Sequence, residues 1–462
     1  MKTKIICTIG PASNTKESLI KLIANGMNVA RVNASHGTKE DIIGAIEFVK
    51  SVRNSLHTPL AIMLDTKGPD IRIGSFENGA VELKKGDAFM LFNKEVSGNQ
   101  SGVSITHKDL YLLVSKGQEM LLNDGLIKLE VREIRGKDII CEVIEGGKLT
   151  NKKSLYVPGV DLKLPFLSSA DKEDLIIAIK TDCDYIASSF TNSARDVLEM
   201  KDFIKKNGGN LPIIAKIESK QGVENIDEIL EVVNGIMVAR GDLGVEYPIE
   251  KIPTLQKMLI KKARDAGKLV ITATEMLESM ISKPRPTRAE TTDIANAIYD
   301  GTGAIMLSAE SAVGAYPDKA VYFMKKIAEE AEQNLVRSGK NVKVINQKQA
   351  YSHTVADAAI NTKSKAIFAY TLKGRTAIRT AQYFPPCPIY AFAKSLKTFH
   401  TLALVDSVVP LYEPNPLGIT DMINQANDFA KDNHIVNDGE LIVITANIKE
   451  TDSDLVIIHP VN

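Results

Sequence analysis

The strongest constraint on the fold is a repeated alternation of short, apolar, β-branched runs with amphipathic helical stretches. Such runs are typical of strands that are buried on both faces. Eight of them are each followed by a helical pattern: Ile5–Ile9, Asn28–Val32, Leu60–Leu64, Tyr185–Ser189, Ile213–Ile217, Ile236–Ala239, Leu269–Ala273 and Ala304–Leu307. Because eight strand–helix units can close a parallel sheet on itself, the pattern predicts an α/β protein with a (β/α)8 TIM barrel.

The alternation is interrupted between Pro69 and about Leu164. Apolar and charged residues alternate with period two over 127–132, which indicates strands with one wet face. We therefore predict an inserted all-β lid domain, a small β-barrel, with hinges at Gly68-Pro69 and Pro158-Gly159. After about Val342, a helix at Ser352–Asn361 and strands at Ala366–Tyr370, Pro388–Ala393 and Leu441–Ala446 predict a C-terminal α/β open-sheet domain. The predicted divisions are 1–69 and 164–341 for the barrel, 70–163 for the lid and 342–462 for the C-terminal domain.

Composition limits the location and the partners of the chain. Its 462 residues have a formal net charge of zero, which gives a nucleic-acid or anionic-membrane partner no overall electrostatic support. The four cysteines are scattered without a Cys-x-x-Cys pair, which argues against structural zinc and a disulfide framework. No apolar stretch is long enough to span a bilayer. We expect a cytoplasmic protein with no nucleic-acid or membrane partner.

Polar residues gather at the carboxyl ends of six predicted strands, where barrel enzymes place their active sites. These segments are Arg31–Gly37, Asp65–Arg72, Lys216–Glu218, Arg240–Glu246, Thr274–Glu275 and Ser308–Glu310. They combine cations, carboxylates and hydroxyls, and no Cys–His or Ser–His pair is among them. Since Arg and Lys neutralise phosphate oxygens and carboxylates bind hard divalent cations, this combination favours phosphoryl transfer.

Lys216 and Glu218 stand two residues apart on one predicted strand, so both side chains point into the barrel. A lone buried pair of this kind is more often a silent structural ion pair. Asp242 follows the next strand and would complete a two-carboxylate magnesium site, which reverses that preference. Gly241 beside it would let the backbone approach an anionic group, although a Gly-Asp turn alone is usually only a turn.

Four oxygen-bearing residues on adjacent loops suit a hard cation of low charge: Asn33, Ser35, Asp65 and Thr66. Ordinary hydrogen bonds of Asn and Ser in a tight loop explain them about equally well. His36 is either a nucleotide contact or a loop hydrogen-bonding residue, and the second interpretation is slightly favoured.

Taken together, several long segments closely resemble the pyruvate kinase family. They are Cys7–Ser13, Gly26–Gly37, Leu64–Gly74, Ile213–Glu218, Met237–Glu246, Thr274–Met280, Lys283–Glu290 and Met306–Glu310. The run Leu-Asp-Thr-Lys-Gly-Pro-Asp-Ile-Arg at 64–72 is long and highly specific. The resemblance implies transfer of the phosphoryl group of phosphoenolpyruvate to ADP, giving pyruvate and ATP in glycolysis. It also implies Mg2+ (or Mn2+) and K+ as cofactors and an allosteric homotetramer.

The resemblance further implies roles for individual residues. Lys216 would stabilise the phosphoryl group in flight and the enolate oxygen, while Glu218 and Asp242 would ligate the divalent metal ion. The K+ site would be Asn33, Ser35, Asp65 and Thr66. Arg31 would hold the transferring phosphate, and the substrate carboxylate would be seated by Ala239, Arg240, Gly241, Asp242 and Thr274. A proton relay would run through Thr274, Ser308 and Glu310, and the nucleotide would face Pro11, Arg31, Asn33, His36 and Arg72.

Some positions depart from the family pattern. Asp70 replaces a usual Glu but keeps its negative charge, so we expect potassium dependence. Glu275 replaces a usual Gln, Ala309 and Ser311 replace Gly and Thr, and Ala170 replaces a Lys thought to help bind nucleotide. In the C-terminal domain, a candidate effector loop comprises Thr371, Gly374, Arg375 and Thr376, but its usual Gly-rich partner loop is replaced by 447–454. The family's sugar-bisphosphate effector is therefore not carried over, and a sugar monophosphate, another metabolite or no effector are all open.

Two rival functions use similar residues. A lyase on a similar barrel would share the carboxylates and arginines, but it would need neither a large β-lid nor a potassium site. A non-catalytic metabolite sensor would not need the intact set Arg31, Lys216, Glu218, Asp242 and Thr274.

Overall fold

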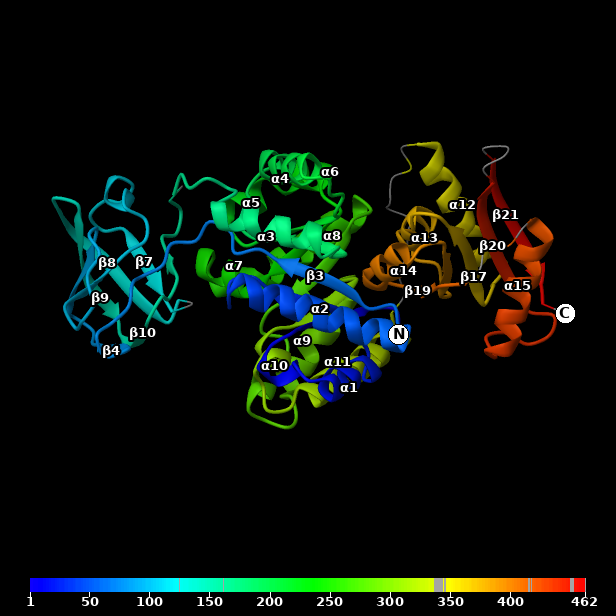
Figure 1. Ribbon diagram of the computed structural model, residues 1–462, viewed down its shortest axis with the longest axis horizontal. Helices are drawn as coiled ribbons and strands as arrows, with labels where there is room; N and C mark the ends of the chain where they lie inside the picture. Colours follow the sequence, from blue (N-terminus) through cyan, green and yellow to red (C-terminus); the bar gives the residue numbers. More distant parts are fainter. Residues whose placement is uncertain are drawn as a thin grey trace.

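The computed structural model describes residues 1–123, 125–160, 162–335, 344, 346–413, 416, 418–448 and 453–461. Figure 1 shows three parts in a row, with the barrel in the centre, the β-rich insertion at one end and the C-terminal α/β part at the other. Among the described helices, none combines the length and the apolar character that a bilayer crossing requires.

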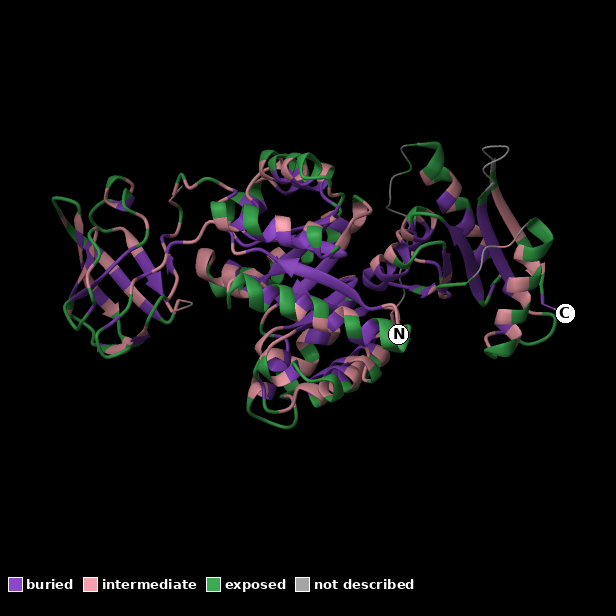
Figure 2. Cartoon of the chain, viewed as in Figure 1, coloured by how far each residue is buried: buried purple, intermediate pink, exposed green. Residues whose placement is uncertain are grey.

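The central sheet is a closed barrel of eight parallel strands in the order β1-β16-β15-β14-β13-β12-β3-β2. Their bounds are β1 Lys4–Thr8, β2 Met27–Asn33, β3 Ala61–Asp65, β12 Tyr185–Ser188, β13 Ile213–Ile217, β14 Gly235–Ala239, β15 Leu269–Ala273 and β16 Ala304–Leu307. The strands are largely buried (Figure 2) because helices cover them outside and side chains fill the barrel inside. The predicted TIM barrel is confirmed, and each predicted strand end lies within one residue of the observed one.

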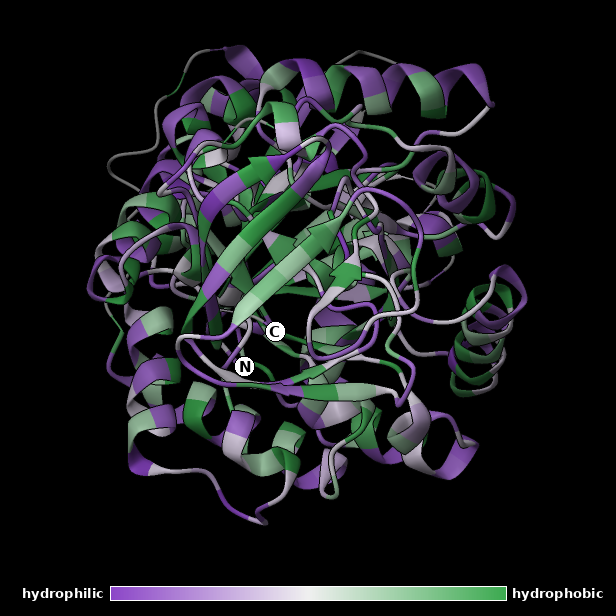
Figure 3. Cartoon of the chain, turned by 90° about the vertical axis from the view of Figure 1, so that its left-hand side faces the viewer, coloured by the Kyte–Doolittle hydropathy of each residue, from purple (hydrophilic) through white to green (hydrophobic). Residues whose placement is uncertain are grey.

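Helices surround the barrel, and Figure 3 shows this ring from the lid end. They are α1 Lys16–Ala24, α2 Lys39–Leu56, α3 Ser169–Lys180, α4 Ala194–Lys206, α5 Lys220–Glu224, α6 Ile226–Val232, α7 Arg240–Glu246, α8 Ile252–Asp265, α9 Arg288–Tyr299, α10 Ala309–Ala312 and α11 Pro317–Gln333. The capping box expected from Thr287 and Glu290 is present at the start of α9. Pro317 begins α11, where its missing N–H costs nothing.

Between β3 and α3, the described residues of the insertion form strands and one 3-10 turn, Leu110–Leu112. In place of the single β-barrel expected from the sequence, the strands form a six-stranded sheet, β11-β7-β8-β9-β5-β6, and a two-stranded sheet, β10-β4. The bounds are β4 Ala80–Leu83, β5 Ala88–Phe92, β6 Gly102–Ser104, β7 Glu119–Leu122, β8 Ile127–Arg135, β9 Asp138–Glu145, β10 Gly147–Thr150 and β11 Leu155–Tyr156. Gly146 separates β9 from β10 at a point where an added Cβ would lie 2.2 Å from the Leu83 carbonyl oxygen. This close approach lets the chain leave β9 and pair with β4.

The C-terminal part is an open five-stranded sheet in the order β19-β18-β17-β20-β21, with β21 antiparallel to β20. Its strands are β17 Ala366–Thr371, β18 Ile389–Ala393, β19 Val408–Leu411, β20 Leu441–Ile448 and β21 Ser453–Pro460, and its helices are α12 Gln347–Asn361, α13 Arg375–Ala381, α14 Leu396–Thr401 and α15 Ile419–Asp432. The open α/β sheet agrees with the sequence prediction, although β19 and β21 were not predicted. The predicted division at 341/342 lies outside the described residues.

The C-terminal part closes the amino end of the barrel. A 3-10 turn, Leu402–Leu404, places Ala403 and Leu404 against the side chains that fill the barrel interior. The Lys4 ammonium donates to the Val408 carbonyl at 2.6 Å, and Arg264 pairs with Asp406 at 3.1 Å. The open mouth is therefore the carboxyl end of the strands, which faces the inserted sheets (Figure 1).

Candidate active site

The centre of the mouth is a buried lysine held by two carboxylates. The Lys216 ammonium, on β13, lies 2.9 Å from Glu218 Oε1 and 3.2 Å from Asp65 Oδ1 at the end of β3. It also donates to the Ser189 hydroxyl at 2.9 Å. The two carboxylates have side-chain exposures of only 1% and 2%, so this charge cluster is nearly free of bulk water. The structure thus brings together strands separated by about 150 residues of sequence, as the barrel closure requires.

Arg31 extends the same network toward β2. Its Nε lies 2.7 Å from Asp65 Oδ2, and its guanidinium donates to the Thr8 hydroxyl at 2.8 Å. Both Asp65 oxygens are therefore bound by cations, one by Arg31 and the other by Lys216. A guanidinium has five N–H donors, so these two bonds leave others for a phosphate.

The pKa values of this network follow from burial and charge. Burial by itself would lower the pKa of Lys216, but Asp65 and Glu218 outweigh burial and raise it above the ordinary value. Burial would raise the pKa of Asp65, but Lys216 and Arg31 lower it on balance. For Glu218, burial together with the nearby Asp242 raises the pKa to about 7 against the opposing charge of Lys216. At neutral pH, Lys216 is therefore charged.

Asp242 and Glu218 lie on neighbouring segments of the rim. Asp242 is in the first turn of α7, which begins directly after β14, and β14 pairs with the strand that carries Lys216. The two carboxylates are close enough for each other's charge to matter, because Asp242 adds to the upward shift of the Glu218 pKa. Asp242 Oδ1 accepts from the Tyr156 hydroxyl at 3.2 Å, and Glu218 Oε2 accepts from the Phe190 N–H at 2.6 Å. Two carboxylates from adjacent strand ends are thus available to one cation.

Two consecutive residues at the end of β15 have left-handed backbones, Thr274 at φ 67° and Glu275 at φ 53°. Such conformations cost free energy in non-glycine residues and must be held by their surroundings. The buried Arg240 guanidinium donates to both carbonyls, at 2.7 Å to Thr274 and 3.0 Å to Glu275, and pairs with Asp293 at 2.6 Å. The Thr274 hydroxyl accepts from the Gly241 N–H at 2.8 Å, so Thr274 and the start of α7 are locked together.

The end of β16 is organised by Glu310. This carboxylate is fully buried, and its two oxygens accept from the backbone N–H groups of Leu277 at 3.0 Å and Ser308 at 2.7 Å. Ser308 precedes α10, and the 3-10 turn that begins at Pro11 contacts that helix. Glu310 therefore ties the loop after β15 to the end of β16.

The residues predicted for a potassium site form two groups. Asn33 Oδ1 accepts from the Ser35 N–H at 3.1 Å, which is the ordinary loop hydrogen bond weighed above. Asp65 is bound to Arg31 and Lys216, while the Thr66 carbonyl accepts from Ser189 at 2.6 Å. Asn33 and Asp65 are register partners on β2 and β3, so the two groups are neighbours on the rim.

Of the expected nucleotide residues, Arg72 lies where the insertion leaves the barrel, and His36 is close enough for the charge of Arg72 to act on it. Arg72 pairs with Asp70 at 2.7 Å, and its side chain also donates to the Lys152 carbonyl. Burial lowers the pKa of His36, and the charges of Arg72, Arg31 and Lys153 lower it further. His36 is therefore neutral at pH 7 in a locally cationic setting. No sequence argument had singled out Lys153.

The chain leaves the barrel for the insertion at Gly68, and this point is held by α3, the first helix after the chain returns to the barrel. Gly68 has φ +71°, and an added Cβ would lie 2.7 Å from the Ser189 Cβ. Its N–H donates to Asp171 Oδ1 at 2.9 Å, while Asp171 Oδ2 accepts from the N–H and hydroxyl of Ser168, the N-cap of α3. One carboxylate thus holds both chain crossings between barrel and insertion.

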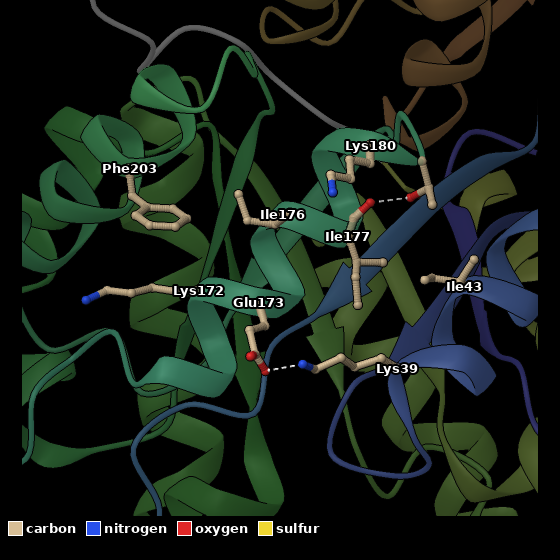
Figure 4. Close-up of a pocket in the computed structure, with 9 residues that line it drawn as sticks. Lys39, Ile43, Lys172, Glu173, Ile176, Ile177, Lys180 and Phe203 are labelled. Atoms are coloured by element: carbon tan, nitrogen blue, oxygen red, sulfur yellow. Dashed lines mark hydrogen bonds and ion pairs between the residues drawn. The ribbon is translucent and has the colours of Figure 1, made fainter.

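A cleft of about 470 Å³ lies between the insertion and the rim. Its lining includes Tyr156, Gly159, Glu218, Lys220 and Glu246. A second cavity of about 360 Å³ lies outside the barrel between α2, α3 and α4 (Figure 4). It is lined by Ile43, Ile176 and Phe203, with the Lys39–Glu173 ion pair at 2.8 Å on its edge, and contains none of the predicted site residues. Of the predicted site residues, Glu218 lines the first cleft.

The structure also places the candidate effector loop and the residues that sequence reasoning missed. Thr371 ends β17, and Gly374, at φ +75°, is the N-cap of α13, which begins with Arg375 and Thr376. Part of the segment 447–454, which replaces the usual Gly-rich partner loop, lies outside the described residues. Sequence reasoning missed Ser189. It ends the fourth predicted strand, and the carboxyl end of a barrel strand is where an active-site residue is expected. Tyr156 was missed because it comes from the insertion.

The barrel and the charges at its mouth define a TIM-barrel phosphotransferase. A family model described as the pyruvate kinase barrel domain matches residues 1–321, and another described as the pyruvate kinase alpha/beta domain matches residues 349–459. The pyruvate kinase of Clostridium perfringens is 44% identical over an alignment of 454 residues that covers 96% of this chain and 96% of its own. That of Geobacillus stearothermophilus is 44% identical over 459 residues, 97% of this chain and 78% of its own. The chain belongs to the pyruvate kinase family, and the resemblance seen in its motifs is confirmed.

Proposed function

We propose that this chain transfers the phosphoryl group of phosphoenolpyruvate to ADP at the mouth of the barrel. The observation that carries the proposal is the convergence of Lys216 with the carboxylates of Asp65 and Glu218 within 3.2 Å, beside Asp242 and Arg31. Phosphoryl transfer needs little covalent help from the protein, and depends on positioning and on positive charge at the migrating group. A buried ammonium that is charged at neutral pH supplies this charge.

The divalent ion of the site is proposed to be Mg2+ or Mn2+, held by Glu218 and Asp242. Within the described residues there is no group of three or more His, Cys, Asp or Glu that could hold a metal ion. Mg2+ is usually held by one or two carboxylates and completes its shell with substrate oxygens and water. A two-carboxylate site therefore fits Mg2+ better than it fits a metal that needs a full set of protein ligands. When bound, the ion supplies positive charge for the phosphate and enolate oxygens.

The side chains of the rim then have separate tasks. Lys216 neutralises the developing enolate oxygen, and Arg31 orients the phosphate with the donors not used by Asp65 and Thr8. The substrate carboxylate is seated by Thr274 and by the backbone of Ala239, Arg240, Gly241 and Asp242. Its binding would replace the bond between the Gly241 N–H and the Thr274 hydroxyl.

Protonation of the enolate is proposed to involve Thr274, Ser308 and Glu310. The Thr274 hydroxyl lies at the end of β15 and Ser308 at the end of β16, next to each other on the rim. Glu310 holds both segments through its bonds to the N–H groups of Leu277 and Ser308.

A potassium ion is proposed to be held by Asn33, Ser35, Asp65 and Thr66, with Asp70 keeping a negative charge nearby. The proposal is supported by the shared position of Asn33 and Asp65 on paired strands. Initial rates should be higher in potassium than in sodium. Equal rates in a buffer that contains only tetramethylammonium would contradict a potassium site.

The nucleotide is proposed to bind between the barrel and the insertion, facing Pro11, Arg31, Asn33, His36 and Arg72. The insertion, proposed to span 70–163, would act as a lid on the Gly68 and Gly159 hinges. The remaining domain limits, 1–69, 164–341 and 342–462, are part of the same proposal.

We also propose a cytoplasmic homotetramer. An effector with a phosphate group, such as a sugar phosphate, would bind at Thr371, Gly374, Arg375 and Thr376.

Metal binding tests this proposal directly. Mn2+ is titrated into the protein without nucleotide and followed by electron paramagnetic resonance. The Glu218→Gln variant should lose tight Mn2+ binding and lower turnover by orders of magnitude. Glu231→Gln, which changes an exposed carboxylate on α6 outside the cleft, should bind Mn2+ like the parent. Unchanged Mn2+ affinity in Glu218→Gln would defeat the proposed metal site.

A further inference from the structure

Helix α7 carries two carboxylates that both contact the return crossing of the insertion. Asp242 and Glu246 are four residues apart, so they lie on the same face of the helix. The Tyr156 hydroxyl, on β11, donates to Asp242 Oδ1 at 3.2 Å. Glu246 lines the same cleft as Gly159 and Lys220, and its carboxylate lies near the backbone of both residues. One helix therefore contacts the chain on both sides of Pro158, immediately before it re-enters the barrel.

Apart from its contacts with α7, the return crossing is part of the insertion. Leu155 and Tyr156 pair with Leu122 and Leu121 of β7, so Tyr156 moves with the six-stranded sheet. Gly159 has φ +73°, a conformation that allows the chain to turn away directly after the contact. The side chain of Tyr156 thus belongs to the lid, while its hydroxyl is bound to a carboxylate of the barrel rim.

We propose that Tyr156 and Glu246 are positioning residues, which seat the lid on α7 and orient the Asp242 carboxylate for its metal ion. This inference rests on the proposed function, because it takes Asp242 as a metal ligand. The bond from Tyr156 engages Oδ1 and restrains the rotation of the carboxylate, which would leave Oδ2 available to a cation. Glu246 supplies the second point of attachment, so that the crossing cannot pivot about the tyrosine alone. Lid position and metal affinity are thereby linked through one carboxylate.

Removing only the hydroxyl tests the link. In Tyr156→Phe, the Mn2+ dissociation constant without nucleotide should rise about tenfold, as is usual when a hydrogen bond to a ligating carboxylate is removed. The Mg2+ concentration for half-maximal activity should rise by a similar factor. Tyr111→Phe removes a hydroxyl from the same insertion without touching α7 and should change neither value.

The position of the lid is measured separately. All four native cysteines are buried, so spin labels can be placed at Arg135→Cys in the lid and Lys206→Cys on α4, both exposed positions. The distance distribution between the labels should broaden in Tyr156→Phe and more so in Glu246→Ala, and should stay narrow in Tyr111→Phe. Glu246→Gln keeps an acceptor oxygen and should restore most of the narrow distribution.

The outcomes separate this inference from the proposed function. Asp242→Asn should abolish tight Mn2+ binding, and retention of binding there would overturn the metal site itself. If Asp242→Asn loses Mn2+ while Tyr156→Phe keeps both the parent affinity and the parent distance distribution, the metal site stands and the positioning role of Tyr156 is overturned.

Discussion

At the scale of single residues, the mouth of the barrel balances buried charges against one another. Lys216 faces Asp65 and Glu218, and Arg31 faces Asp65. Taking one charge out of such a group leaves its partners buried without compensation, which costs more than the pair contributes when intact. Function and stability are therefore linked at this site.

Replacing Lys216 by methionine should lower both activity and stability. The loss of the ammonium should reduce turnover by about 10²- to 10³-fold or more, since the proposed function places it against the group that gains charge during the reaction. The uncompensated carboxylates should lower the free energy of unfolding by about 3 kcal/mol, measured by urea denaturation. Lys206→Met, at an exposed lysine of α4, is the matched control and should change neither. A Lys216→Met enzyme with more than about a tenth of the parent turnover would contradict the role assigned to this residue.

Sequence reasoning at this scale succeeded where strand geometry alone decides the answer. Residues that are two positions apart on a strand point to the same face, and this rule predicted that Lys216 and Glu218 lie together. It failed for Tyr156 because the partner of a lid side chain depends on how two separately folded parts sit together. The bond between Asp65 and Lys216 required the order of strands around the barrel, which the periodicity of a single strand does not contain.

At the scale of elements, the first turn of α3 is both a helix cap and a clamp for the lid. Asp171 accepts from Ser168, as the reciprocal half of a capping box, and from Gly68 at the outgoing hinge. Asp196 occupies the same place in the capping box of α4, where it accepts from Ser193 and Asn192. The two helices thus offer a matched comparison.

Asp171→Ala and Asp196→Ala should each lose about 1 kcal/mol of stability through the cap. Each substitution also leaves a second backbone N–H without its acceptor, Gly68 in Asp171→Ala and Asn192 in Asp196→Ala, but only the Gly68 bond is buried. The loss should therefore be larger in Asp171→Ala, by about 1 kcal/mol. Because the hinge is loosened, Asp171→Ala alone should raise the KM for ADP and lower kcat together. Urea denaturation and initial rates measure both effects. Equal behaviour of the two variants would show that Asp171 is only a cap.

Elements of the barrel were predictable because buried parallel strands are continuous apolar runs with helices between them. The strands of the insertion alternate with period two, and that pattern gives each strand's faces but not its partner. The division into a six-stranded and a two-stranded sheet was therefore missed. In the C-terminal part, β19 is a four-residue edge strand with Pro410 in it, a residue that weakens any strand prediction.

At the scale of the whole molecule, the two ends of the barrel are occupied by different partners. The insertion faces the open mouth, and the C-terminal part seals the other end with Ala403 and Leu404 (Figure 1). The seal also contains charges, with Arg53 bound to Asp184 at 2.6 Å and Lys397 bound to Asp182 at 2.8 Å. His400 is buried among them.

The seal should make stability depend on pH through His400. Burial lowers its pKa to about 4, with Arg53 and Lys397 also opposing protonation, and Asp184 and Asp182 favouring it. The unfolded chain therefore binds a proton between about pH 6.5 and pH 4 that the folded chain does not. Stability from this group is complete above about pH 6.5 and is lost as the pH falls through that window.

Thermal unfolding of His400→Asn between about pH 7 and pH 5 should show a shallower fall in Tm than the parent, because this proton linkage is removed. His434→Asn changes an exposed histidine and should keep the parent slope. Identical slopes for all three proteins would mean that His400 is not a neutral buried group.

The central claim is that a charged lysine and two metal-binding carboxylates, brought together by barrel closure, move one phosphate. The most direct measurement is the initial rate of pyruvate release from phosphoenolpyruvate, with and without ADP and Mg2+. The parent should release pyruvate only when both are present, and Lys216→Met, Glu218→Gln and Asp242→Asn should each lose this activity. Release of pyruvate without ADP, or an undiminished rate in any of the three variants, would contradict the account.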